Sequence, residues 1–182
     1  FYVLFNLILV ALTALIYTND IFTGFVFLEI ATLASVGITM IRDQGRSTIA
    51  AIRYMIFNLV GSGLFLIGIT LLYDWTGYLS MGWVTDKGVI IMLADKVSEI
   101  IASNTMTPLA FITFSLITVG LAIKAGLFPF HFWMPDTYGS STTASKCVLS
   151  GLISKGYIIL LIKMIYRCFG VENFKASGLF TI

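Results

Sequence analysis

Apolar residues gather in long runs along the chain, and short polar stretches separate these runs. A helix that crosses a bilayer needs about 20 mostly apolar residues. Because a backbone in lipid must form its hydrogen bonds within its own segment, such runs form helices rather than strands. The pattern therefore predicts an all-α, polytopic transmembrane helix bundle with five spans, at 1–18, 21–41, 54–73, 107–130 and 144–166.

The longest polar stretch, residues 74–106, separates the third and fourth predicted spans. It contains VIIMLADKVSEIIA, which is long enough for a short amphipathic helix at the membrane interface. The prediction is one transmembrane domain over 1–182 with an extramembrane loop at 74–106. The chain opens FYVLFNLILV, with neither a Met nor a basic leader, and stops after ASGLFTI, so we expect a fragment of a longer chain.

The connection RDQGRSTIAAIR, between the second and third spans, carries Arg42, Arg46 and Arg53. Arginine-rich loops favour the cytoplasmic side, which would put residue 1 inside and the end of the last span outside. Other basic residues would then lie outside, against the same rule: Lys163, Arg167 and Lys175. The opposite orientation therefore stays open.

Composition supports the membrane interpretation and excludes several classes of protein. Hydrophobic residues make up 58% of the chain and charged residues 11%, with a mean hydropathy of +0.98. Soluble domains average about 25% charged residues. A soluble chain of 182 residues cannot bury this much apolar surface, so an ordinary soluble enzyme is excluded. The net charge of +2 comes from scattered residues and does not indicate nucleic-acid binding.

The chain offers few ligands for a metal or a cofactor. Cys147 and Cys168 have a spacing that fits neither a disulfide framework nor a zinc site, and His131 is the one histidine. Gly61 belongs to a GSG triplet inside an apolar run, which indicates close helix packing rather than a nucleotide loop. We therefore expect no cofactor and no metal in this chain.

Three charged residues lie well inside the predicted spans: Glu29, Lys124 and Lys155. Each costs at least about 2.5–3.5 kcal/mol at a helix centre on insertion scales. Lys146, in the first turn of the last span, can be either an interfacial lysine or part of the same machinery. Within the last span, Cys147, Gly151 and Lys155 are each four residues apart and therefore share one helix face. Small residues on such a face predict packing against another helix.

Two interpretations of these charges remain. A buried Glu29–Lys124 pair can hold two helices together, but such pairs rarely stabilise more than apolar residues of the same volume, and Lys155 is left without a partner. The functional interpretation is a proton relay. Desolvation favours a neutral lysine and a nearby carboxylate favours a charged one, so a small movement can change which form is present. Intramembrane ionisable residues are by default functional.

Gly126 and Pro129 follow Lys124 closely and predict that the helix is discontinuous there. Broken backbone at membrane depth is tolerated where it is buried in protein or lines a wet cavity. A charge beside such a break is typical of transporter sites. A simple proline kink at a helix end is the alternative.

The segment KAGLFPFHFWMPDTYGSSTTASKCVLSGLISKGYIILLIK resembles the signature region of the antiporter-like proton-translocating membrane subunits. That family includes subunits of respiratory complex I, of Mrp-type cation/proton antiporters and of energy-converting membrane-bound hydrogenases. FVFLEIATLASVGI resembles the family's glutamate helix. The resemblance implies a subunit of about fourteen helices built from two inverted five-helix repeats, of which this chain would be helices four to eight.

The resemblance also implies roles for single residues. Glu29 and Lys124 would be a switchable pair, and Lys155 would carry the proton onward. His131 would have a secondary, structural or gating role. SSTTASKCVLSG departs from the family's proline-containing pattern, which leaves the proton entry and the role of Lys146 open.

The function implied is proton translocation within a multi-subunit complex, coupled to electron transfer. The alternatives are an Mrp-type secondary sodium/proton antiporter subunit and, more remotely, a structural subunit that transports nothing. Expected partners are the lipid bilayer, sister membrane subunits and a peripheral redox arm, whose own chains would hold iron–sulfur clusters or flavin. The expected location is a bacterial or archaeal cytoplasmic membrane, crossed several times.

Overall fold

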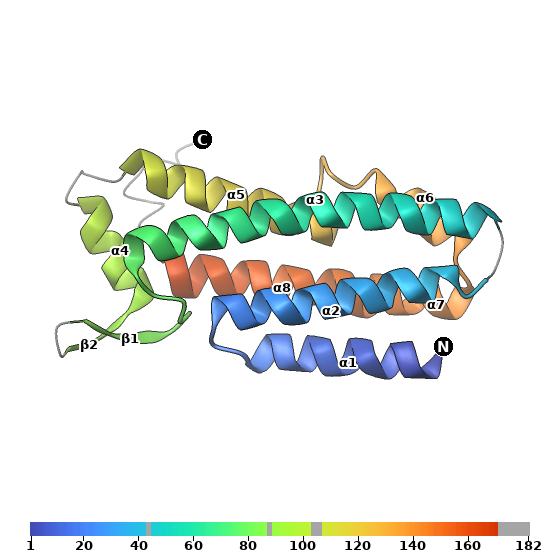
Figure 1. Cartoon of the computed structure of the whole chain (residues 1–182), viewed down its shortest axis with the longest axis horizontal. Coiled ribbons are helices and arrows are strands. Elements are labelled where there is room, and N and C mark those ends of the chain that lie inside the picture. The colour runs from blue at the N-terminus through green and yellow to red at the C-terminus, as the bar shows by residue number, and fades with distance from the viewer. Residues whose placement is uncertain (43–44, 87–88, 103–106, 171–182) are drawn as a thin grey trace.

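The fold is a bundle of long helices that lie side by side (Figure 1). The structure is a computed structural model and describes residues 1–42, 45–86, 89–102 and 107–170. Lys175 lies outside these residues. The long elements are α1 (Tyr2–Tyr17), α2 (Ile21–Met40), α3 (Gly45–Thr76), α5 (Thr107–Ala125) and a composite helix of α7 (Thr143–Val148), η1 (Leu149–Ile153), α8 (Ser154–Met164) and η2 (Ile165–Phe169).

Four of the described helices are long and apolar enough to cross a membrane: Ile21–Met40, Gly45–Thr76, Pro108–Ala125 and Thr143–Phe169. The first predicted span, 1–18, corresponds to α1, which has 16 residues. At 1.5 Å per residue α1 is roughly 24 Å long, less than the ~30 Å hydrocarbon core. Four of the five predicted spans are therefore supported by helix length and composition, and a span at 1–18 stays a prediction.

Helix α3 is longer than its predicted span of 54–73, because it begins at Gly45 and has 32 residues. Most of the predicted arginine-rich connection is thus helical. The physical reason is that its apolar positions recur at helical spacing, so Ala50, Ala51 and Tyr54 pack into the core while Arg46 and Arg53 stay exposed.

The turn between α1 and α2 is held by polar side chains. The Asp20 carboxylate caps α2 by accepting from the Thr23 N–H at 2.7 Å. From α8, the Lys163 ammonium donates to the Thr18 carbonyl and, at 3.1 Å, to the Ile16 carbonyl. Lys163 therefore caps the C-terminus of α1, a contact that connects the first and last helices of the bundle.

One end of the bundle carries a small hairpin and a short helix (Figure 1). Strands β1 (Trp83–Asp86) and β2 (Val89–Met92) pair antiparallel, so the all-α expectation misses a two-stranded sheet. Helix α4 (Leu93–Ala102) follows, with Leu93 and Val97 buried. That the segment 74–106 lies outside the membrane stays a prediction.

The predicted span 107–130 ends early, at Ala125, and a further helix follows it. Helix α6 (Trp133–Ser140) occupies the connection between the fourth and fifth predicted spans. It begins with buried Trp133, and Thr137 and Ser140 are buried along the same face. Helix α6 lies beside the N-terminal half of α3, at the other end of the bundle from the hairpin (Figure 1).

Helices α3 and α5 come together at paired glycines. A Cβ at Gly120 would lie 2.7 Å from the Gly61 carbonyl oxygen, and one at Gly61 would lie 2.9 Å from that of Gly120. Backbones this close leave no room for any side chain. The close-packing interpretation of Gly61 is therefore confirmed, and the contact places α5, with Lys124, directly against α3.

Candidate functional site: a buried ion pair between α2 and α5

The position of Lys124 follows from the way α5 ends. The N–H of Leu127 bonds the Ala122 carbonyl at 2.9 Å and that of Gly126 bonds the Ile123 carbonyl at 3.2 Å. Gly126 has φ +68°, a left-handed conformation that glycine adopts without strain. Together these features form a Schellman motif, which ends a helix cleanly. Lys124 is thereby fixed in the last turn of α5.

Helix α6 closes over the same helix end. The Trp133 indole N–H donates to the Ile123 carbonyl at 3.0 Å and is the second donor to that oxygen, which also accepts from the Gly126 N–H. The Trp133 ring also packs on Tyr54 of α3, with 4.6 Å between the ring centroids. Helix α6 therefore covers the last turn of α5, whereas the connection that follows is half-buried at Gly126 and exposed at Pro129.

The end of α5 and the middle of α2 meet at a charged pair. The Lys124 ammonium donates to Glu29 Oε1 at 2.9 Å. The lysine side chain is 0% exposed, whereas that of the glutamate is 29% exposed. The structure therefore brings together two residues that are 95 positions apart, as the sequence predicted, and the glutamate is the accessible end of the pair.

Hydroxyl groups surround the pair. The Ser62 hydroxyl of α3 donates to Glu29 Oε1 at 2.5 Å. The Lys124 ammonium also donates to Thr32 Oγ1 at 3.0 Å, and Thr32 Oγ1 lies 2.9 Å from the Tyr157 hydroxyl of α8. Buried charges persist where such hydrogen bonds replace water. The result is a polar site in the centre of the bundle, to which four helices contribute.

Lys155 lies elsewhere, on the exposed side of α8. It lines a surface groove of about 300 Å³ together with residues of α1 such as Leu12 and Thr13. Within the described residues Lys155 forms no ion pair. Cys147 and Gly151 are exposed as well, so the predicted packing role of this small-residue stripe is wrong for the described bundle.

The two secondary candidates also lie apart from the ion pair. The ring of His131 stacks between Phe128 and Phe132, with centroid distances of 5.9 and 5.3 Å. Its Nδ1 atom is buried and has no hydrogen-bond partner among the described residues. Lys146 is half-buried near the end of α7 and forms no ion pair in the part of the chain that the structure describes.

Sequence reasoning missed the hydroxyls of the site. Thr32 lies three residues after Glu29 on one face of α2, so helical spacing is a signal that could have found it. Ser62 had the same kind of signal, since it follows Asn58 and Gly61 on one face of α3. Tyr157 had none, because a tyrosine in an apolar helix is most simply interpreted as part of the core.

The fold and the site define a class: a multi-pass membrane protein with a buried carboxylate–ammonium pair beside a broken helix. Residues 18–182 match the family described as NADH:quinone oxidoreductase/Mrp antiporter, transmembrane. The chain belongs to this family. The resemblance of its signature region to the antiporter-like subunits is thereby confirmed.

Curated relatives of two kinds are similar to the chain. It is 31% identical to an NADH-quinone oxidoreductase subunit of Desulforudis audaxviator, over 91% of this chain and 30% of that protein. It is 30% identical to a probable K(+)/H(+) antiporter subunit of Rhizobium meliloti, over 98% of this chain and 31% of that protein. The chain thus spans about a third of the length of these relatives.

A solved structure shows the same fold. The chain superimposes with a TM-score of 0.79 on a chain of the membrane-bound sulfane sulfur reductase, an archaeal respiratory membrane complex. The sequences are 28% identical, and the match covers 97% of this chain and 33% of that chain.

Proposed function

We propose that the chain forms part of a proton-translocating, antiporter-like subunit in which Glu29, Lys124 and Lys155 carry the proton. The observation that carries the proposal is the fully buried Lys124 ammonium, held 2.9 Å from a partly exposed carboxylate inside the membrane bundle. A proton that leaves Lys124 for Glu29 turns a charged pair into a neutral one, so the pair can exist in two protonation arrangements. In this proposal the chain corresponds to helices four to eight of the whole subunit, its first inverted repeat.

Lys155 is the proposed next station. It is exposed in a groove between α1 and α8, where water or a polar group can reach its ammonium. Lys163 and Arg167 are excluded from the relay because both bind the α1–α2 turn: Lys163 donates to the Ile16 carbonyl and Arg167 to Asn19 Oδ1. His131 and Lys146 remain secondary candidates for gating and proton entry.

Coupling to electron transfer is the leading assignment for the complete complex. Support comes from the similarity to an NADH-quinone oxidoreductase subunit and to a chain of a respiratory reductase. In this assignment the chain itself binds no redox group, and iron–sulfur clusters or flavin belong to partner subunits. The second candidate, a secondary cation/proton antiporter, is supported by the similarity to a K(+)/H(+) antiporter subunit.

Substitution of the lysines tests the relay. We expect Lys124→Ala and Lys155→Ala to leave the complex assembled while proton transport per assembled complex is lost. Lys155→Arg is expected to fail as well, because arginine keeps its charge but cannot release its proton. The measurement is proton uptake into vesicles that contain the purified complex. Assembled Lys155→Ala complexes that transport at the full rate would falsify the relay.

Purification of the native complex through this subunit separates the two assignments. Iron–sulfur signals in low-temperature EPR, together with co-purifying redox subunits, are the expected result for an electron-transfer pump. A complex made of membrane subunits alone, without such signals, would contradict that assignment and support the antiporter.

A further inference from the structure

Thr32 is the point where the helix of Glu29, the Lys124 ammonium and helix α8 meet. Its Oγ1 atom lies 2.8 Å from the Leu28 carbonyl, 3.0 Å from Lys124 Nζ and 2.9 Å from the Tyr157 hydroxyl. A hydroxyl has one hydrogen and two lone pairs, whereas a carbonyl only accepts and an ammonium only donates. Thr32 therefore donates to Leu28 and accepts from both Lys124 and Tyr157, which fills each of its positions.

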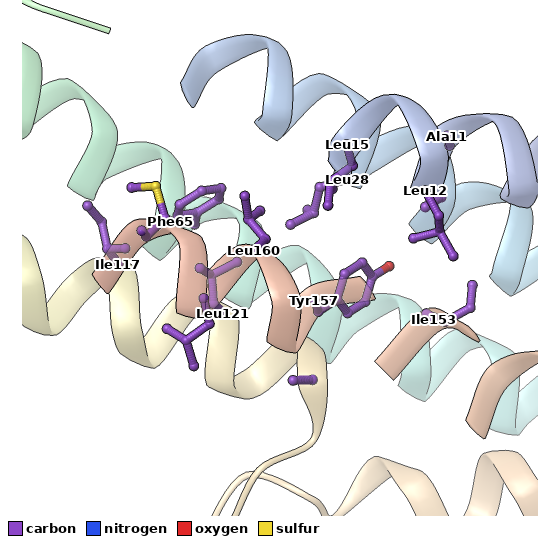
Figure 2. Close-up of a cluster of buried hydrophobic side chains, with 14 of the residues drawn as sticks. Ala11, Leu12, Leu15, Leu28, Phe65, Ile117, Leu121, Ile153, Tyr157 and Leu160 are labelled. Atoms are coloured by element: carbon purple, nitrogen blue, oxygen red, sulfur yellow. The ribbon is translucent and has the colours of Figure 1, made fainter. Parts of the chain in front are cut away.

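Tyr157 acts on the ammonium in two ways. Its side chain is fully buried and projects from α8 into the core, among Leu12, Leu28 and Leu121 (Figure 2). Its hydroxyl donates to Thr32, which fixes the orientation in which Thr32 accepts from Lys124. Its ring centroid lies 5.8 Å from Lys124 Nζ, within the range of cation–π attraction. The ring contact favours the charged form of the lysine, and the hydroxyl contact holds in place the oxygen that accepts from the ammonium.

The other groups near Lys124 come from α2, α3 and α6. Glu29 of α2 is the carboxylate that faces the ammonium. Tyr54 of α3 bonds Ser35 Oγ at 2.7 Å and also interacts with the Tyr157 hydroxyl. From α6, the indole of Trp133 is neutral and bonds the Ile123 carbonyl. Tyr157 is thus the group on α8 that contacts the Lys124 ammonium, through its ring and through Thr32.

We propose that Tyr157 is a positioning residue that keeps the proton on Lys124 and thereby couples helix α8 to the Glu29–Lys124 pair. The proposal rests on the proposed relay. Lys155 lies two residues before Tyr157 on the same helix. A movement of α8 that displaces Lys155 would therefore also displace Tyr157 and change its contacts with Lys124. When Tyr157 withdraws, an N–H bond of the ammonium breaks and the proton bonds a carboxylate oxygen of Glu29. A neutral amine and a neutral carboxylic acid remain.

The experiment is the pH dependence of proton transport by the complete complex in vesicles, compared between the wild type and Tyr157→Phe. Phenylalanine keeps the ring and the packing but removes the hydroxyl. We expect transport to decline at a lower pH than in the wild type, by about half a unit to one unit, the scale of one hydrogen bond. Thr32→Val is expected to shift the profile in the same direction, and Thr32→Ser to restore it.

Thr39→Val is the matched control. Thr39 lies seven residues further along α2, is equally buried, and its hydroxyl bonds the Val36 carbonyl of its own helix at 2.6 Å. Its loss is expected to leave the pH profile unchanged. Tyr54→Phe, one bond further from Lys124, is expected to give a smaller shift than Tyr157→Phe.

The outcomes separate this inference from the relay itself. Full transport by Lys124→Ala would overturn the relay. If Lys124→Ala is inactive while Tyr157→Phe has the wild-type pH profile, or loses rate equally at each pH, the positioning role alone is wrong. If Tyr157→Phe does not assemble, the Thr32→Val and Thr32→Ser pair decides: equal profiles for the two would contradict the proposal.

Discussion

Lys124 and Lys155 look alike in the sequence, since each is a lysine well inside an apolar helix, yet the bundle treats them in opposite ways. The Lys124 ammonium is fully buried and donates to a carboxylate at 2.9 Å and a hydroxyl at 3.0 Å. Lys155 is exposed, lines a groove and forms no ion pair within the described residues. The cost of a charge at membrane depth is therefore offset by the chain's own groups at one lysine. At the other it requires water or a partner in the groove.

This difference separates structural from functional demands. Lys124 is hydrogen-bonded to its surroundings, so if the proposed relay holds we expect its substitution to alter both stability and transport. Lys155 forms no ion pair in the described bundle, so if the proposed relay holds we expect its substitution to change transport with a small effect on stability. Removal of the positive charge is thus expected to lower stability at Lys124 but to leave it almost unchanged at Lys155.

The largest expected effect comes from Glu29→Gln, which leaves the buried Lys124 ammonium without its carboxylate. Removal of one partner from a buried pair costs about 3–5 kcal/mol. We expect the free energy of unfolding of the purified complex to fall by about this amount, whereas Lys155→Met changes it by less than about 0.5 kcal/mol. Thermal unfolding in detergent is the measurement.

The double variant Glu29→Gln with Lys124→Met is the control for charge. It removes both partners, and we expect it to recover most of the lost stability while transport stays absent. Glu29→Gln complexes as stable as the wild type would show that the ammonium is not dependent on this carboxylate.

The glycines near the two lysines give a second test. Gly120 is in backbone contact with Gly61, one turn before Lys124, whereas a Cβ at Gly151, one turn before Lys155, meets no atom within 4 Å. Gly120→Ala is expected to lower the free energy of unfolding by about 1–3 kcal/mol through overpacking. Gly151→Ala is expected to be neutral or slightly stabilising, because alanine is the better helix former. Equal melting temperatures for the two variants would contradict the close contact of α3 with α5.

The smallest expected effect concerns an ion pair at the surface. Arg53 of α3 and Asp136 of α6 lie 2.5 Å apart, but their side chains are 60% and 49% exposed. Exposed pairs contribute about 0–1 kcal/mol and weaken in salt. We expect Arg53→Ala to lower the melting temperature only slightly, with a difference from the wild type that shrinks in high salt. A loss as large as that of Glu29→Gln would break the distinction between buried and exposed pairs.

Much of the site could be predicted from the sequence because charges in apolar helices are few and costly. Glu29 is the one carboxylate deep in the predicted spans, and only Lys124 and Lys155 were candidates to pair with it. Gly126 and Pro129 marked the end of the helix, since glycine tolerates a left-handed conformation and proline lacks an N–H. These signals depend on single residues whose backbone or charge requirements are strong.

The remainder depends on tertiary packing, which single residues do not reveal. Thr13 and Thr32 both bond carbonyls of their own helices, so this bond does not separate the threonine that binds Lys124 from the one that does not. The spacing from Glu29 marks Thr32 as a candidate, but only the packing of α5 against α2 shows that it contacts the lysine. Helix α6 has a proline at its third position and a glycine at its seventh, so local propensity did not reveal it. Trp133, bound to the end of α5 and packed on Tyr54, holds it in place.

The short distance between Lys124 and Glu29 determines how strongly the membrane voltage can act on proton transfer between them. A proton that passes from one to the other moves at most 2.9 Å, about a tenth of the ~30 Å hydrocarbon core. One elementary charge that crosses the whole membrane exchanges about 2.3 kcal/mol with a potential of 100 mV, so this step exchanges only about 0.2 kcal/mol. In the proposed relay the exchange within the pair is therefore almost electrically silent, and we expect any voltage dependence of transport by the complete complex to arise at a longer step.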